Sequence, residues 1–166
     1  MRRPSSNAFL IAAALVAASG MALAKSSDRN QTMSLEYDWS DCSLGSNMSC
    51  EMRGNIVITQ GTLKINASQG NFNQSGGRPS KAHLSGGVTM SQQLDDGTPV
   101  NTKSSTVDYD FSTEIVILTG GVVINQPRGS LRGERVVYNM RTGQVQSGGQ
   151  GNGRVRMTIQ PKTGGN

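Results

Sequence analysis

The chain is 166 residues long, with a formal net charge of +5 at pH 7, 21 glycines and only 4% aromatic residues. One histidine and two cysteines leave little material for a metal centre built on those ligands. Glycine at this level can accompany disorder. Here, however, the glycines recur at fixed positions between stretches rich in Val, Ile and Tyr, which favours a folded chain.

The first 24 residues have the features of a secretory signal. Two arginines precede an apolar run over residues 8–18, and the segment 22–24 (Ala-Leu-Ala) has small residues where signal peptidase requires them. Cleavage is therefore predicted between Ala24 and Lys25. No stretch reaches the roughly 20 apolar residues that span a bilayer, so the processed protein, of one-domain size, is predicted to be soluble.

The region that follows, residues 25–51, contains Cys42 and Cys50. In an oxidising compartment an even number of cysteines this close together favours a structural disulfide. Closing so short a loop contributes roughly 2 to 3 kcal/mol in a chain-entropy model, which suits the polar segment 40–49. A metal or redox site is the weaker alternative, because no histidine lies nearby and the spacing is not Cys-x-x-Cys.

From residue 52 onward one pattern is written three times. It occurs at Met52–Gln60 (MRGNIVITQ), Leu84–Gln92 (LSGGVTMSQ) and Leu118–Gln126 (LTGGVVINQ), at intervals of 32 and 34 residues. Such self-similarity indicates small units that bury their apolar face only by stacking on neighbours. In each unit Gly-Gly or Gly-Asn precedes alternating residues, which predicts a bend that leads into a strand.

Two further short strands are predicted in each unit. The first appears as Gly61–Lys64 in unit one and as Gly129–Arg132 in unit three, and the second carries an aromatic residue 20, 25 and 20 residues after the pattern begins. The aromatic residues are Phe72, Tyr109 and Tyr138. The longer offset is attributed to an inserted hairpin tip at Leu94–Pro99, whose Asp-Gly pair favours a tight turn.

After residue 30 no window of a dozen residues has the spacing of an amphipathic helix, so we predict a single, repeat-built, all-β domain. If the strands share an interior, alternation places one apolar stripe on it. Its members are Ile56, Ile58, Leu63, Ile65, Val88, Met90, Val107, Tyr109, Phe111, Val122, Ile124, Val136 and Tyr138. Two interpretations stay open, a packed solenoid core and a groove of flexible aliphatic side chains that accepts a long acyl chain.

Charge is divided unevenly along the chain after the leader. Residues 118–166 carry seven basic residues and one acidic residue, a balance of +6, whereas residues 25–117 carry seven basic and ten acidic residues, a balance of −3. A basic C-terminal half suits phosphate-bearing ligands or an acidic neighbour, although solvated outer faces are the simpler explanation. Nucleic acid is not predicted as a partner, because no recognised motif is present and the chain is exported.

Candidate catalytic groups are sparse. The titratable candidates are His83, the turn residues Asp95 and Asp96, and the strand residues Asp108 and Asp110. His83 is predicted to be a turn or surface residue, and the strand pair flanks Tyr109 on the face opposite its ring. None of these is specific for acid–base chemistry, so we predict no catalytic residue, no metal site and no cofactor.

Four segments carry a specific resemblance to a known family. They are Gly54–Ala67 (GNIVITQGTLKINA), Asp96–Val100, Val107–Tyr109 and Val116–Gly120. In this order, and with a Gly-Asn-Val-x-Val-x-Gln-Gly type of core in the first segment, the chain from about Met52 to Pro161 resembles the LptA/OstA family of periplasmic lipopolysaccharide-transport proteins.

The resemblance implies a twisted antiparallel β-jelly roll, V-shaped and open on one side. It also implies a periplasmic carrier with the acyl chains of lipid A in the groove, which stacks head to tail as a homo-oligomer and bridges the two membranes. The implied partners are an inner-membrane export complex (LptC-like) at the N-terminal end and an outer-membrane insertion complex (LptD-like) at the C-terminal end. The family's lipid-contacting positions fall on Met90, Tyr109 and Phe111, and further on Met33 and Leu35.

The predicted organisation is a cleaved signal at 1–24, an N-terminal strand region at 25–51, an OstA-like β-roll at 52–160 and a flexible tail at 161–166. Two other functions remain as alternatives to lipopolysaccharide transport. One is a structural secreted β-solenoid, an assembly or adhesion module with a packed interior. The other is a polysaccharide-acting enzyme.

The end strands of the roll are expected near Met33–Tyr37 and Arg154–Ile159. Unpaired strand edges can extend a sheet into a neighbouring chain, and head-to-tail contacts that do not close form filaments. The opposite charges of the two halves are expected to favour that orientation.

Overall fold

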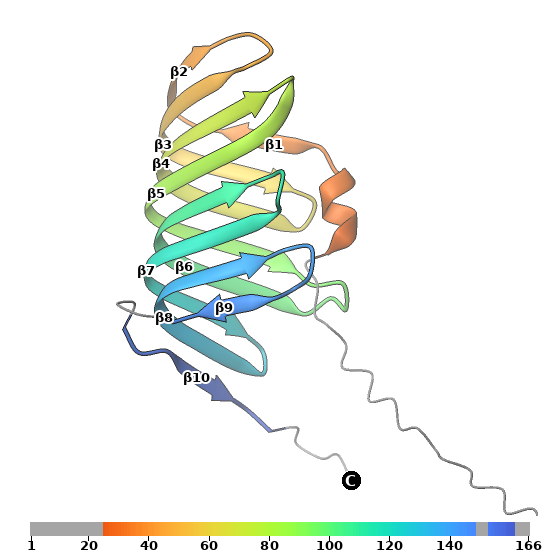
Figure 1. The fold of residues 1–166 in the computed structure, drawn as a ribbon, viewed down its shortest axis with the longest axis vertical. Coiled ribbons are helices and arrows are strands. Elements are labelled where there is room, and N and C mark those ends of the chain that lie inside the picture. Colours follow the sequence, from red (N-terminus) through yellow and green to blue (C-terminus); the bar gives the residue numbers. More distant parts are fainter. Residues whose placement is uncertain (1–24, 149–152, 162–166) are drawn as a thin grey trace, which may run out of the picture.

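The computed structural model describes residues 25–148 and 153–161, so the predicted signal at 1–24 and most of the predicted tail lie outside the described residues. A short 3-10 helix, η1, precedes the strands in the described part of the chain (Figure 1). The elements are η1 (Ser26–Asn30), β1 (Met33–Glu36), β2 (Trp39–Ser43), β3 (Ser49–Gln60), β4 (Leu63–Ser75), β5 (Arg78–Gln93), β6 (Pro99–Asp110), β7 (Ile115–Gln126), β8 (Gly129–Asn139), β9 (Val145–Ser147) and β10 (Arg156–Ile159). Among the described residues, no helix is long and apolar enough to cross a membrane.

All strands of the described residues belong to one antiparallel sheet. Its order is β1-β3-β4-β5-β6-β7-β8-β10, with β2 also pairing with β3 and β9 also pairing with β8. The hairpins from β3 to β8 are therefore stacked in chain order along one axis (Figure 1). This arrangement confirms the predicted all-β, repeat-built roll.

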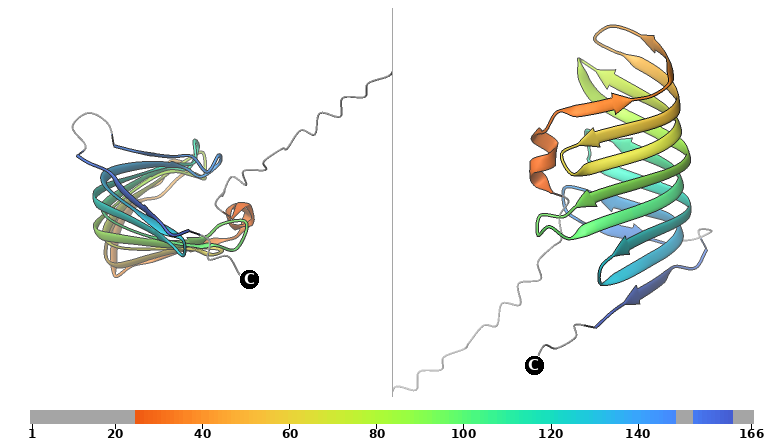
Figure 2. Two further views of the ribbon diagram at one scale, coloured as in Figure 1. Left: turned by 90° about the horizontal axis from the view of Figure 1, so that it is seen from below. Right: turned by 180° about the vertical axis from the view of Figure 1, so that it is seen from behind.

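Each of the six long strands bends near its middle, which divides the sheet into two walls. The bend is marked by a shift in strand register, for example between Arg53 and Ile56 on β3. We call one part of the sheet wall A. It consists of β1, β10 and residues 56–67, 88–104 and 122–133 of the long strands and their turns. We call the other part wall B, which consists of β2 and residues 49–53, 69–85, 106–119 and 135–147. Viewed along the axis, the walls form a V that is open on one side (Figure 2, left).

The corner between the walls is built by bulges in which two residues of one strand lie opposite one residue of the next. Gly86 and Gly87 of β5 face Ser105 of β6 in this way, between register pairs on either side. The φ angle of Gly86 is 84°, a left-handed conformation, and a Cβ there would lie 2.6 Å from the Cβ of Ser68. The Ser68 hydroxyl instead donates a 2.9 Å hydrogen bond to the Gly86 carbonyl. Glycine is required here because it avoids both the strain and the collision.

The interior faces of the two walls pack against each other in a single apolar core. On wall B one row runs through Cys50, Phe72, Ala82, Tyr109, Val116 and Tyr138 on successive strands. On wall A a second row runs through Ile58, Ile65, Met90, Thr102, Ile124 and Leu131. The predicted aromatic residue of each unit thus occupies one row of the sheet.

The structure corrects the predicted number of strands per unit. The sequence predicts separate strands at Gly61–Lys64 and at Phe72. In the structure Gly61 and Thr62 form a turn, and the residues from Leu63 to Phe72 belong to one continuous strand, β4. A bulged bend within a continuous strand produces the same glycine signal as the end of a strand. The inserted hairpin tip is confirmed, because Leu94 and Thr98 close a turn between β5 and β6 with a 2.9 Å backbone hydrogen bond.

The N-terminal region closes one end of the roll. Cys42 on β2 and Cys50 on β3 lie directly opposite each other and form the predicted disulfide. The β1 strand pairs with the other half of β3, so β1 and β2 cap wall A and wall B respectively. At the opposite end, β10 and β9 occupy the equivalent positions.

Candidate apolar groove

The thirteen residues predicted to form the interior stripe all belong to the core between the walls. Ten of them are buried, and Tyr109, Phe111 and Ile124 are partly buried against the others. Alternation of side chains along each strand accounts for this result, since every second residue of a strand faces the same side of a sheet. Their contact with a lipid remains a prediction.

The core contains a small, partly open apolar cavity. Its volume is about 20 Å³, which has room for roughly one water molecule. It is lined by Met33, Ile58, Leu63, Ile65, Ala82, Leu84, Met90, Val107, Tyr109, Phe111, Val116 and Met140. The interior is therefore closely packed in this state, and a larger guest requires the walls to separate.

Sequence reasoning missed four of the residues that line the cavity. These are Ala82, Leu84, Val116 and Met140. Ala82 and Leu84 precede Gly86 at alternate positions, so the period-two signal continues through the strand before the glycine pair. Placing the bend inside a strand, and not at its beginning, was the missing step.

Three aromatic rings lie together on the interior side of wall B. The Tyr109 and Phe111 ring centroids are 4.1 Å apart, and Phe72 meets Phe111 edge to face at 5.9 Å. Burial raises the pKa of the Tyr109 hydroxyl, and the nearby Glu114 carboxylate raises it further. The Tyr109 side chain is therefore neutral at neutral pH.

Polar side chains interrupt the apolar surface of wall A. Gln92, Thr102 and Ser104 are all buried. The Ser104 hydroxyl has no hydrogen-bond partner among the described residues. A buried hydroxyl without a partner is costly, so this position is a polar spot in an interior that is otherwise aliphatic.

The N-terminal segment lies beside the open side of the V (Figure 2). This segment is attached to the strand turns of wall A, where the Lys25 backbone N–H donates to the Gln93 carbonyl at 3.1 Å and Thr62 donates to Asp28 at 2.5 Å. Figure 2 places η1 at the end of one wall, beside the opening. We call residues 25–31 the strap.

An ion pair joins the strap to wall B. The Arg29 Nη1 atom lies 2.7 Å from Oε2 of Glu114, which is in the turn between β6 and β7. The Glu114 side chain is only 17% exposed, and Arg141, in the next turn of wall B, reaches its Oε1 atom at 3.5 Å. We call Arg29, Glu114 and Arg141 the mouth triad.

The titratable candidates from the sequence lie outside the groove. His83 is on β5 and not in a turn, and its Nδ1 atom is 2.7 Å from Asp108 on the solvent-exposed outer face. Asp96 accepts a hydrogen bond from the backbone N–H of Thr98, which lowers the pKa of its carboxyl group. Among the described residues, no group of three or more His, Cys, Asp or Glu side chains could hold a metal ion.

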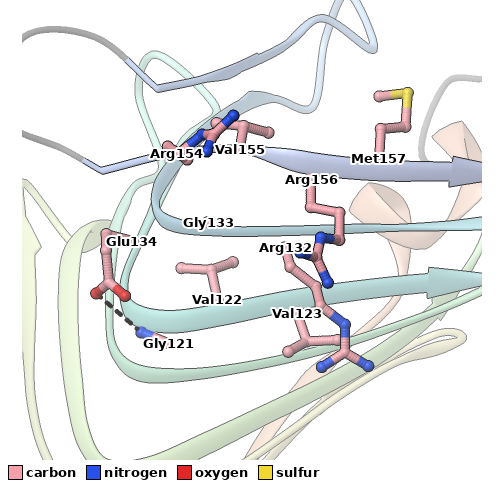
Figure 3. A pocket seen from close by; sticks show the side chains of 10 residues that line it. All are labelled: Gly121, Val122, Val123, Arg132, Gly133, Glu134, Arg154, Val155, Arg156 and Met157. Atoms are coloured by element: carbon pink, nitrogen blue, oxygen red, sulfur yellow. Dashed lines mark hydrogen bonds between the residues drawn. The ribbon is translucent and has the colours of Figure 1, made fainter.

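A second, open cleft lies at the end of the roll formed by β8 and β10. Its volume is about 690 Å³. Arg132 and Arg156 occupy directly opposite positions on the two strands, and both line the cleft (Figure 3). Arg154 and Glu134 also line it. We call this the arginine cleft.

Comparison with known proteins identifies the family. The model of the family described as "LptA/(LptD N-terminal domain) LPS transport protein" matches residues 42–144, which is more than half of the chain. The chain belongs to this family. Membership agrees with the open, antiparallel roll, with the repeated hairpins and with the predicted resemblance.

Individual members of the LptA family are similar over most of their length. The lipopolysaccharide export system protein LptA of Escherichia coli K12 is 29% identical over 155 residues, which cover 92% of this chain and 83% of that protein. LptA of Haemophilus influenzae is 30% identical over 167 residues, which cover 94% and 92% of the two chains.

A solved structure shares the fold. It is LptH of Pseudomonas aeruginosa, described as the LptA-homologous periplasmic component of the lipopolysaccharide transport device. The TM-score is 0.71 at 22% sequence identity, and the match covers 81% of this chain and 99% of LptH. At this identity the likeness establishes the LptA-type fold.

Proposed function

We propose that the protein is a non-enzymatic periplasmic carrier that holds the acyl chains of lipopolysaccharide between walls A and B. The observation that carries this proposal is the largely apolar interior of a sheet whose walls are joined by strands only along the corner. Membership of a lipopolysaccharide-transport family supports the choice of ligand. Aliphatic side chains and Met90 suit acyl chains, because they adapt in shape.

Opening of the V is the step that makes room for the lipid. The cavity of about 20 Å³ is too small for an acyl chain. The corner is held by strand hydrogen bonds, whereas the open side is closed by side-chain packing and by the mouth triad. Separation of the walls about the corner therefore opens the core without breaking the hydrogen bonds between the strands.

The two ends of the roll support head-to-tail stacking. Strands alternate in direction along the sheet, so the β1 strand of a second copy placed beside β10 would run antiparallel to it, and β2 beside β9 likewise. Both end strands of wall A would meet, as would both end strands of wall B. A stack of this kind continues the walls, and the groove between them, from one copy to the next.

Uncovered apolar side chains support the same contact. Met157 and Ile159 on β10 are 62% and 72% exposed, and Val145 on β9 is 45% exposed. Met157 is paired with the buried Leu131 and Val145 with the buried Tyr138, so both continue interior rows of the sheet. A following copy would cover them with its own first strands, which carry Met33 and Leu35 on the interior side.

The charges at the two ends are complementary. The arginine cleft lies at the β10 end, and the acidic residues Glu36, Asp38 and Asp41 are exposed at the β1 and β2 end. Opposite charges orient the approach of two copies and accelerate it. The same ends are those at which the chain would meet an LptC-like inner-membrane partner and an LptD-like outer-membrane partner, through the β1 and β10 ends respectively.

Photo-crosslinking in living cells tests the carrier. A photoreactive residue is placed at Tyr109, which lines the cavity, or at Asp108, which is exposed on the outer face of the same strand. Capture of lipopolysaccharide at Tyr109 and not at Asp108 is expected. Equal, background capture at both positions would instead support the structural β-solenoid, which the close packing of the interior favours.

A further inference from the structure

The mouth triad adjoins residues that line the apolar cavity. Glu114 follows Tyr109 and Phe111, which line the cavity, and its carbonyl accepts a 2.9 Å hydrogen bond from the backbone N–H of Met140, another lining residue. Arg141 is the next residue along the chain. Cationic groups thus stand at the rim of a groove whose wall is apolar, an arrangement that matches an amphiphile with an acidic headgroup.

The triad carries one more positive charge than negative charge. Two guanidinium groups meet one carboxylate, with Nη atoms 2.7 Å from one oxygen and 3.5 Å from the other. The Oε2 atom of Glu114 is buried and accepts no well-aligned hydrogen bond from the described residues, despite its short distance to Arg29. A phosphate group offers more acceptor oxygens and suits the fork of a guanidinium better than this carboxylate does.

The backbone of Glu114 adopts a conformation that is unfavourable for a residue with a side chain. Its φ angle is 57°, in the left-handed region that residues with a Cβ rarely adopt. Non-glycine residues persist in this region only where the surroundings hold them, and such positions cluster at ligand-binding and switching sites. The ion pairs with Arg29 and Arg141 supply part of that hold.

The Arg29–Glu114 pair also links the two walls. Arg29 belongs to the strap, which is bound to wall A, and Glu114 belongs to a turn of wall B. A ligand that takes Arg29 from Glu114 therefore removes the ion pair between the strap and wall B, one of the contacts that hold the walls together. Binding at the rim would in this way favour opening of the groove.

We propose that Arg29 and Arg141 form a phosphate site at the mouth of the groove, where Glu114 is the internal anion that a lipid phosphate displaces. This proposal rests on the proposed lipid-carrying function and names the part of the ligand that is recognised. The ligand class is a phosphorylated, acylated glycolipid. Its phosphate occupies the arginines while its acyl chains enter between the separated walls.

The test compares two lipids on the purified, disulfide-bonded protein. The probes are bisphosphorylated lipid A and the same lipid A after enzymatic removal of both phosphates, in the same detergent, with the dissociation constants measured by calorimetry. We expect the phosphorylated lipid to bind at least about tenfold more tightly, as loss of a charge-assisted hydrogen bond would predict. Arg29→Gln and Arg141→Gln should each remove most of this preference and leave binding of the dephosphorylated lipid equal or tighter.

Glu114→Gln removes the internal anion, so it is expected to tighten binding of the phosphorylated lipid. Arg53→Gln is the matched control, because Arg53 also pairs with a glutamate, Glu51, but on the exposed outer face. That variant should keep the wild-type preference. Arg29→Lys keeps the charge and should keep part of the preference, which preserves the test if Arg29→Gln fails to fold.

Four outcomes would overturn the proposal. Equal binding of both lipids by the wild-type protein would remove the phosphate site and leave the groove, whereas binding of neither lipid would remove the carrier function as well. An unchanged preference in both arginine variants would show that the recognition lies elsewhere. Inorganic phosphate at the lipid's concentration should not displace the lipid, and displacement would assign the arginines to free phosphate instead.

Discussion

Ser68 and Gly86 meet across the corner of the roll, where the serine hydroxyl donates to the glycine carbonyl at 2.9 Å. The contact recurs one hairpin further along, where the Ser105 hydroxyl donates to the Gly120 carbonyl at 3.3 Å. A glycine and a serine on neighbouring strands therefore form a repeated corner element. We expect this element to set the angle between the walls.

Substitution at the corner tests this element. Gly86→Ala is expected to destabilise the protein by more than the roughly 1 to 2 kcal/mol that a left-handed conformation costs an L-residue, because its Cβ would also collide with Ser68. The control is Gly87→Ala, where φ is 81° but no atom lies within 4 Å of the added Cβ. Urea unfolding measures both variants, and equal losses would show that crowding at the corner is unimportant.

A core substitution tests whether the interior is packed or loose. Leu84 is 1% exposed, and Leu84→Ala is expected to lower the free energy of unfolding by about 2 to 5 kcal/mol. Leu44, at 86% exposure, is the matched control and should change it by no more than about 0.5 kcal/mol on replacement by Ala. A small loss at Leu84 would indicate that the walls are already separated in solution.

The disulfide is expected to stabilise the end of the roll at β2 and β3. Replacing Cys42 and Cys50 together by Ala should cost about 2 to 3 kcal/mol, the value of closing a loop of this length. The urea midpoint of the double variant, compared with that of the oxidised protein, measures it. No difference would mean that the pairing of β2 with β3 is fixed by strand contacts alone.

Acid should weaken the turn between β6 and β7. The Ser112 hydroxyl, followed by the backbone N–H of Thr113, lowers the pKa of Asp110 from its ordinary value of 3.8. A group whose pKa is lower in the folded state contributes stability above the unfolded value and loses it as the pH falls through the folded value. Asp110→Asn should therefore lose stability near pH 6, and this loss should shrink as the pH falls further and further below 3.8. A loss that stays the same across this range would contradict this assignment.

Self-association should depend on the uncovered end of the roll. Ile159→Asp introduces a charge at a side chain that is 72% exposed on β10 and is expected to shift the protein towards monomer in sedimentation velocity experiments. Thr89→Asp places the same charge on β5, in the middle of the sheet, and should leave association unchanged. Equal effects of the two substitutions would indicate a contact away from the strand ends.

Period and parity made the interior of this fold accessible to sequence reasoning. Ile58, Met90 and Ile124 fall on one row because alternation within a strand and repetition between strands both leave a trace in the sequence. The cysteine pair and the hairpin tip at Leu94–Pro99 were also predictable, because each is marked by residues that lie close together in the sequence. Local patterns, repeated or closely spaced, were sufficient for these features.

Features that depend on distant contacts were not accessible. The η1 helix is a polar segment with no helical periodicity, and it is held in place by contacts with Thr62, Gln93 and Asp95. The partner of Arg29 is Glu114, far along the chain, and nothing in either local sequence marks the pair. The bent strands were divided wrongly for a related reason, since a bulge is defined by the neighbouring strand.

The repeated corner has a consequence for how such a molecule can change in length. Each hairpin carries its own corner residues, so the cross-section of the roll does not depend on how many hairpins are present. Duplication of one hairpin would add two strands, or roughly 10 Å along the axis, and leave the side chains of every existing row facing the same way. Length and calibre are thus encoded separately, the first by the number of hairpins and the second by the positions of Gly86, Gly120 and their serine partners.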